Sequence, residues 1–228
     1  ALDRSKWEVL FGSDWRQRAG QIIVSEPGQS FGGRTLCLSK SPPPAVPFEL
    51  SVTVKLDDES GAAGLAFVSD GGDHHYGFYP SGGGLRLTCF RGPDISRWQI
   101  LEQVSSSHYV PGEWNQLKVR LETDRILCFV NGAKVIENRD TSFRSGRIGL
   151  AKFRDTSASF RQFSWGTMLP AGPSPEEIAR LDESLGRSRL GSIDRYLIDH
   201  AADASSLLER RARELEIQAA QWRQLRHR

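Results

Sequence analysis

The sequence predicts an all-β fold, a two-sheet antiparallel sandwich of the jelly-roll type, over residues 1–169. Apolar and polar residues alternate along 115–122 and again along 125–130, so one face of each strand can enter a core. The pair Asn131-Gly132 then offers the positive φ angles of a two-residue hairpin turn. We expect the following side chains inside the sandwich: Leu117, Val119, Ile126, Cys128, Ile148 and Leu150.

Short strand candidates follow one another with no helical pattern between them, which is typical of two packed antiparallel sheets. Glycine, proline, aspartate and asparagine separate them, residues that favour turns. The proline-rich segment 41–47 lacks most backbone donors, so we expect a stiff crossing between the sheets or an edge. The candidates are 21–24, 35–38, 48–56, 64–68, 75–79, 85–90, 98–103, 115–122, 125–130, 134–137, 147–153 and 159–165.

Length and charge limit the function classes. A chain of 228 residues accommodates one large all-β domain and a small second unit. A net charge of +2 provides no basic footprint, so we expect no nucleic-acid partner. No run of about 18 apolar residues occurs, so we expect no membrane insertion. The compartment stays open, with export or a cell-surface location in a bacterium as one candidate.

The cysteines are predicted to be structural. Cys37, Cys89 and Cys128 each fall within a strand-like segment, and they form an odd, widely spaced set. Such a set is typical of small buried apolar residues and not of a disulfide framework.

The character of the chain changes at 169–173, Leu-Pro-Ala-Gly-Pro. Residues 170–228 are predicted to form a helical C-terminal extension, or a linker to a further domain. Leu208, Leu215 and Trp222 recur every seven residues, so they would form one apolar stripe on a helix. The stripe either packs on the sandwich or binds a partner, including a second copy of the chain.

Several of these motifs together resemble a known superfamily. Gly112-Glu-Trp-Asn115, the Asn131-Gly132 hairpin, the segment 146–150 and the segment 160–163 are similar to the concanavalin A-like (laminin G-like) jelly-roll superfamily. The resemblance covers residues 5 to 168. Within the superfamily, it is nearest to bacterial 3-keto-disaccharide hydrolase-like domains and to carbohydrate-binding modules appended to glycosidases. It implies the fold, whereas function must be argued from residues.

The sequence lacks the motifs of several enzyme classes. A retaining glycosidase needs two carboxylates flanking the sugar bond, and no predicted strand carries such a pair. The acidic run 57–59 precedes Ser60-Gly61 and is interpreted as a turn. No nucleophile-elbow, phosphate-loop or zinc-ligand spacing is found. We therefore favour a non-enzymatic role.

One loop has a density of polar residues that suits a metal. Asp70, Asp73 and His74 are candidate metal ligands, for a transition metal or for calcium. Adjacent residues on a strand point to opposite faces, so His74 and His75 are not expected to bind the same ion. The alternative is a solvent-exposed loop with no cofactor.

Sugar recognition needs an aromatic platform for the apolar sugar face and planar polar groups for its hydroxyls. Residues of these types gather in the middle of the sequence. They are His75, Tyr79, Arg86, Arg91 and Trp98, our candidate ligand-binding residues.

Three functional hypotheses follow. The leading one is a non-catalytic carbohydrate-binding (lectin-like) module of a bacterial multidomain protein. The second is a glycoside or 3-keto-disaccharide hydrolase, in which Asp73, His74 and His75 assist a metal or water. The third is a structural spacer whose C-terminal helix binds a partner. An exposed aromatic groove would favour the first, a metal or a carboxylate pair the second, and a salt-bridged sheet the third.

Overall fold

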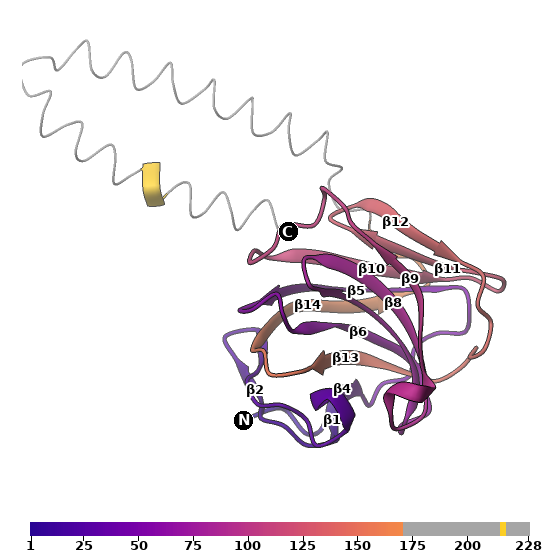
Figure 1. Ribbon diagram of the computed structural model, residues 1–228, viewed down its shortest axis with the longest axis horizontal. Helices are drawn as coiled ribbons and strands as arrows, with labels where there is room; N and C mark the ends of the chain where they lie inside the picture. Colours follow the sequence, from indigo (N-terminus) through magenta and orange to yellow (C-terminus); the bar gives the residue numbers. More distant parts are fainter. Residues whose placement is uncertain (171–214, 218–228) are drawn as a thin grey trace, which may run out of the picture. The chain divides into compact units, whose positions relative to one another are not determined.

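The computed structural model describes residues 1–170 and 215–217. Residues 1–170 form one compact unit, a sandwich of two seven-stranded antiparallel sheets (Figure 1). This architecture confirms the predicted all-β sandwich. In this described part, no helix is long and apolar enough to cross a membrane.

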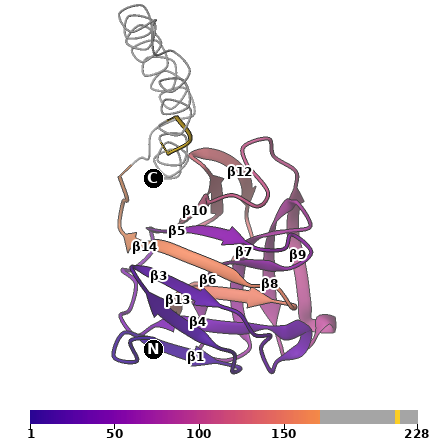
Figure 2. The ribbon, with the colours of Figure 1, turned by 90° about the vertical axis from the view of Figure 1, so that its left-hand side faces the viewer.

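The sheets, here called sheet A and sheet B, form two layers (Figure 2). In spatial order, sheet A contains β1 (Trp7–Leu10), β4 (Thr35–Ser39), β13 (Arg147–Phe153), β6 (Ala62–Ser69), β7 (His74–Ser81), β8 (Gly84–Arg91) and β9 (Trp98–Val104). Sheet B contains β12 (Ala133–Asn138), β11 (Ile126–Val130), β10 (Asn115–Leu121), β5 (Phe48–Leu56), β14 (Ala158–Gly166), β3 (Gln21–Val24) and β2 (Trp15–Arg18). Two short 3-10 turns are η1 (Phe31–Gly33) and η2 (Ile95–Arg97).

The main core lies between the two sheets. All six side chains predicted to enter it are 0% exposed, because their strands alternate apolar and polar residues. The three cysteines are free and buried, as predicted. Burial raises the pKa of the Cys89 thiol to about 11, and it raises the pKa values of Cys37 and Cys128 as well. These thiols therefore act as small apolar side chains.

Two predicted connections are also confirmed. Asn131 and Gly132 join β11 to β12 with φ angles of 47° and 83°, which is the left-handed backbone that their hairpin needs. The proline-rich segment 41–47 joins β4 of sheet A to β5 of sheet B. It is therefore a crossing between the sheets.

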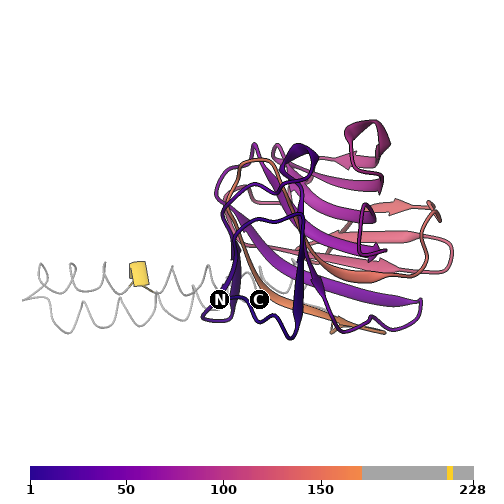
Figure 3. The same cartoon turned by 90° about the horizontal axis from the view of Figure 1, so that it is seen from below.

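A second apolar cluster, which the sequence did not predict, covers the outer face of sheet A. We call it the outer cluster, and its buried members include Leu36, Tyr79, Phe90 and Phe153. Trp98 packs against it from β9. Figures 1 and 3 show η1, in indigo, beside η2, in magenta. The outer face of sheet A is thus a small second core with a loop-built rim.

The predicted C-terminal extension falls almost entirely outside the described residues. Residues 215–217 are helical, and Leu215 is exposed there. Leu208 and Trp222 lie outside the described residues, so the apolar stripe and its partner stay a prediction.

Candidate functional site

A pocket opens on the outer face of sheet A, and we call it the outer pocket. Its volume is about 240 Å³. Strands β6 to β9 and β13 contribute to it, together with η1 and η2. Its lining residues are Phe31, Gly32, Ala62, Tyr79, Ser81, Arg86, Thr88, Ile95, Trp98, Ile100, Phe153 and Arg154.

The apolar part of the outer pocket is centred on Trp98. The Trp98 ring stands edge-on to Phe90, with ring centroids 4.9 Å apart, and edge-on to Phe31 at 5.6 Å. Phe31, Ile95 and Ile100 are 50%, 65% and 49% exposed. Large apolar side chains exposed together around a pocket are typical of binding surfaces. The rim can therefore contact an apolar ligand face.

The polar part of the outer pocket contains hydroxyl and guanidinium groups. The Tyr79 hydroxyl and Thr88 Oγ1 are 2.8 Å apart and share a hydrogen bond. Arg86 Nε donates to Gln103 Oε1 at 2.9 Å. One Arg154 nitrogen donates to Ser81 Oγ at 3.3 Å and to the carbonyl of Ser60. Burial raises the pKa of Tyr79, so its hydroxyl stays protonated at neutral pH.

A buried arginine supports Trp98 from beneath. Arg34 is 0% exposed, and its guanidinium carbon lies 5.3 Å from the centroid of the Trp98 ring. It forms an ion pair with Asp73, and it donates to the Gly92 carbonyl at 3.5 Å. Trp98 Nε1 donates to the same carbonyl at 3.1 Å. Burial lowers the pKa of Arg34, while Asp73 opposes that shift. This charge pair and the shared carbonyl fix the position of Trp98.

The structure brings three of the five predicted ligand-binding residues together. Tyr79, Arg86 and Trp98 all line the outer pocket. His75 lies on the same face of β7 as Tyr79 but is fully buried, stacked on Phe90 with centroids 4.3 Å apart. Arg91 instead donates to Asp140 and to Ser142 Oγ, at 3.3 and 2.7 Å. The role of all five in ligand binding stays a prediction.

The predicted metal ligands already have protein partners. Asp70 accepts hydrogen bonds from the Gly72 amide at 2.7 Å and lies 2.8 Å from His74 Nδ1. Asp73 is the partner of Arg34. His74 is exposed and His75 is buried, and as adjacent residues of a strand they point to opposite faces. Within the described residues, no group of three or more His, Cys, Asp or Glu side chains could hold a metal ion. The metal and calcium assignments stay predictions.

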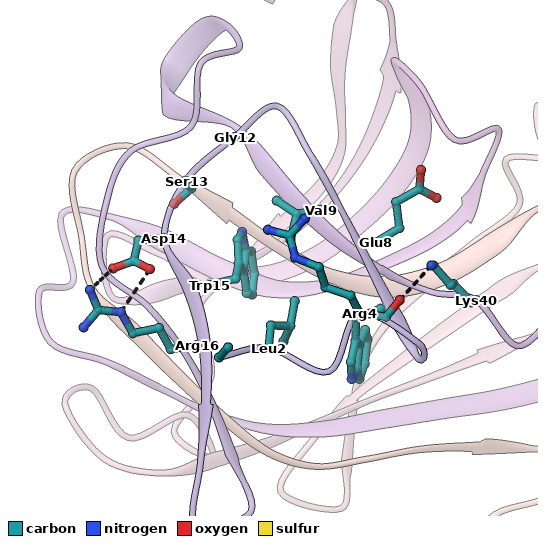
Figure 4. A pocket seen from close by; sticks show the side chains of 12 residues that line it. Leu2, Arg4, Glu8, Val9, Gly12, Ser13, Asp14, Trp15, Arg16 and Lys40 are labelled. Carbon is teal, nitrogen blue, oxygen red and sulfur yellow. Dashed lines mark hydrogen bonds and ion pairs between the residues drawn. The ribbon is translucent and has the colours of Figure 1, made fainter.

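A larger pocket of about 840 Å³ lies at the edge strands β1 and β2, and we call it the edge pocket (Figure 4). Its charged groups are largely satisfied by nearby protein groups. Arg16 pairs with Asp14 at 2.5 Å, and Lys40 Nζ donates to the Arg4 carbonyl at 2.7 Å. Charged side chains are a common protection for open sheet edges. The edge pocket therefore has a structural explanation.

Ion pairs lie on the part of the outer face of sheet B that β5 and β10 form. Glu49 is 5% exposed, and it lies 3.8 Å from Lys118 Nζ and 3.3 Å from Arg120. Arg120 also pairs with Glu122 at 2.9 Å. These charges therefore satisfy one another.

Several residues that line the outer pocket or hold it in place were not predicted from the sequence. Phe31, Phe153 and Arg154 are far from the central segment, and Arg34 follows a pair of glycines. Strand alternation places Phe153 on the same face as Ala151, which is a weak signal. The contact of η1 with β9 is tertiary and has no local signature.

Comparisons with known proteins agree with this fold. Carbohydrate-binding module CBM66 from Bacillus subtilis is 18% identical, with a TM-score of 0.59 over 70% of this chain and 94% of that one. A Bacillus subtilis protein of unknown function with a galectin-like fold is 12% identical, with a TM-score of 0.55 over 72% and 90%. A proposed glycosyl hydrolase from Parabacteroides distasonis is 14% identical, with a TM-score of 0.50 over 73% and 90%.

At these identities, the structural neighbours show the fold alone. No curated protein matches the chain. The sequence model of one domain family does match it, over residues 5–165, in agreement with the resemblance found in the sequence. Because the match spans most of the chain, this protein belongs to the family of 3-keto-alpha-glucoside-1,2-lyase-like domains.

Proposed function

We propose that this protein is a non-catalytic carbohydrate-binding domain and that the outer pocket holds the sugar. The observation that carries the proposal is the position of Trp98, whose partly exposed ring borders the same pocket as the guanidinium groups of Arg86 and Arg154. The family to which the chain belongs and the structural neighbour CBM66 both support a role connected with sugars.

The pocket chemistry suits a sugar ring. The apolar face of a pyranose can lie against Trp98 and the exposed rim of Phe31 and Ile100, while hydroxyls accept from the guanidinium groups. A volume of about 240 Å³ is below the ~300–1,000 Å³ typical of drug-sized ligands. One sugar unit therefore fits the pocket, and the remainder of a glycan would extend along the exposed rim.

Replacement of Trp98 by Ala is expected to weaken glycan binding about 30-fold, which corresponds to about 2 kcal/mol for a central aromatic anchor. The measurement is isothermal titration against a panel of soluble plant and bacterial polysaccharides, beginning with the wild-type protein. A thermal melt of each variant separates lost binding from lost folding.

The matched control is Trp7→Ala. Trp7 is also partly buried, but it lines the edge pocket. We expect the Trp7→Ala protein to bind the glycan with the same affinity as the wild-type protein. If Trp7→Ala abolished binding and Trp98→Ala did not, the sugar site would be the edge pocket. If the folded wild-type protein bound no glycan of the panel, the proposed function would be wrong.

The family description makes a lyase the second candidate. Elimination across C1 and C2 of a 3-keto glucoside requires a base that removes the proton at C2. The described residues that line the outer pocket provide hydroxyl and guanidinium groups, with no carboxylate or imidazole among them. We therefore expect no release of aglycone from a 3-keto glucoside. If the wild-type protein cleaved a 3-keto glucoside and the Trp98→Ala protein did not, the outer pocket would be the active site of a lyase. The proposal of a non-catalytic binding domain would then be wrong.

A further inference from the structure

We infer that the outer pocket selects an acidic saccharide, one that carries a carboxylate on the sugar ring, as uronic acids do. This inference rests on the proposed function and names the substrate class of the same site. It depends on two arginines in the pocket and on how they differ from six other arginines of the described sandwich, each of which pairs with a carboxylate.

In the described part of the chain, no carboxylate pairs with Arg86 or Arg154. Among the described residues, their hydrogen bonds go to neutral oxygens, those of Gln103, Ser60 and Ser81. By contrast, the following arginines each form an ion pair with a carboxylate: Arg16, Arg34, Arg91, Arg120, Arg125 and Arg147. The described lining of the outer pocket includes no acidic residue. Within this described lining, no carboxylate therefore compensates the positive charge.

The two guanidinium groups act on the same point of the pocket. Both lie close enough to the Tyr79 hydroxyl to lower its pKa, against the larger opposing effect of burial. An anion beside that hydroxyl would interact with both charges. A planar guanidinium also matches a carboxylate in shape, since two parallel N–H groups can donate to its two oxygens.

Arg154 is held in place before any ligand binds. Its backbone adopts a φ of 61°, in the left-handed region that is unfavourable for most residues. Its amide donates to the Gly32 carbonyl at 2.7 Å, which connects β13 to η1. A Cβ on Gly33 would lie 3.0 Å from the Arg154 amide nitrogen, so the two segments approach closely. Together with the hydrogen bonds of its guanidinium to Ser60 and Ser81, this fixed backbone reduces the conformational entropy that ligand binding would otherwise remove.

The test compares a carboxylate with its neutral counterpart on one sugar backbone. Oligogalacturonides and their methyl esters are titrated into the wild-type protein. We expect the acid to bind about tenfold more tightly, as a charge-assisted pair in a partly open pocket would give. The acid's affinity should fall as NaCl increases from 50 to 500 mM, while the ester's affinity stays constant, because salt screens exposed charges.

Variants assign the preference to the two arginines. Arg86→Gln and Arg154→Gln keep a hydrogen-bond donor but remove the charge, so the ratio of acid to ester affinity should fall toward one. The matched control is Arg97→Gln, an exposed arginine on η2 that does not line the outer pocket. The Arg97→Gln protein should have the same ratio of acid to ester affinity as the wild-type protein.

The outcomes separate the inference from the proposed function. Equal binding of acid and ester, both weakened by Trp98→Ala, would overturn the acidic preference and leave the carbohydrate-binding function standing. Tighter binding of a sulfated glycan than of the uronate would overturn the assignment of a carboxylate. Absence of binding to any glycan, acidic or neutral, would overturn the proposed function itself.

Discussion

Replacement of Asp73 by Ala is expected to destabilise the protein by about 3 kcal/mol, because it leaves the Arg34 guanidinium buried without its counter-charge. The Arg34 side chain is 0% exposed, whereas the Asp73 side chain is 34% exposed. Water therefore reaches the carboxylate, which places the expected effect at the low end of the ~3–5 kcal/mol typical of broken buried pairs. Urea unfolding followed by circular dichroism measures the change.

The neighbouring Asp70→Ala variant is the matched control. Asp70 and its partner His74 are both about half exposed, so loss of this pair should cost under about 1 kcal/mol. The double variant Arg34→Met with Asp73→Leu should recover part of the stability lost in Asp73→Ala, since it removes both charges. Equal stability of the Asp73→Ala and Asp70→Ala proteins would show that Arg34 does not depend on its ion pair.

The free energy of unfolding is expected to decrease as the pH falls below about 6.5, because the pKa of His75 is lower in the folded protein than in the unfolded chain. Burial lowers the pKa of His75 from 6.5 to about 3, and the nearby charges of Arg34 and His74 act in the same direction. The hydrogen bond to the Tyr76 carbonyl and the charge of Asp70 oppose the shift. The imidazole is therefore neutral in the folded protein at pH 5.

The direction follows from proton binding. Between pH 6.5 and about 3, the unfolded chain binds a proton at His75 and the folded chain does not, so acid favours unfolding. From pH 7 to pH 5, this single group should remove roughly 2 kcal/mol from the free energy of unfolding. His75→Phe keeps a ring stacked on Phe90 and should flatten this part of the pH profile. An unchanged profile in His75→Phe would contradict the assignment.

The strands could be predicted closely because their sequence signal is local. The segments 21–24, 48–56 and 147–153 match strands β3, β5 and β13 to the residue. Strands β1 and β2 were missed, because each contains at most one β-branched residue, whereas the equally short β3 contains three. Three of the four β2 residues are exposed, as suits an edge strand.

The candidate site could be predicted in part, because strand alternation indicates which residues share a face but not how loops pack over that face. Tyr79 and Arg86 are cross-strand partners on β7 and β8, so one face carries both. Arg86 and Arg91 are five residues apart, an odd spacing that places them on opposite faces of β8. Burial of His75 depends on the packing of Phe90 and the loops over sheet A, and strand alternation alone does not contain that information.

The residues that hold the outer pocket in place could not be predicted from the sequence either. The pairing of Arg34 with Asp73 connects two loops 39 residues apart. Either residue alone is a common solvated charge, and only the fold brings them together beneath Trp98. The same holds for Arg154, whose place beside η1 follows from the antiparallel pairing of β13 with β4.

Binding of sugar at Trp98 can be followed through the indole N–H resonances of the six tryptophans. A protein labelled with ¹⁵N is titrated with the tightest glycan, and each indole is assigned by a Trp→Phe variant. We expect a large shift of the Trp98 resonance, with the Trp7 and Trp15 resonances of the edge pocket unchanged. Shifts of Trp7 and Trp15 with a stationary Trp98 would contradict binding at Trp98.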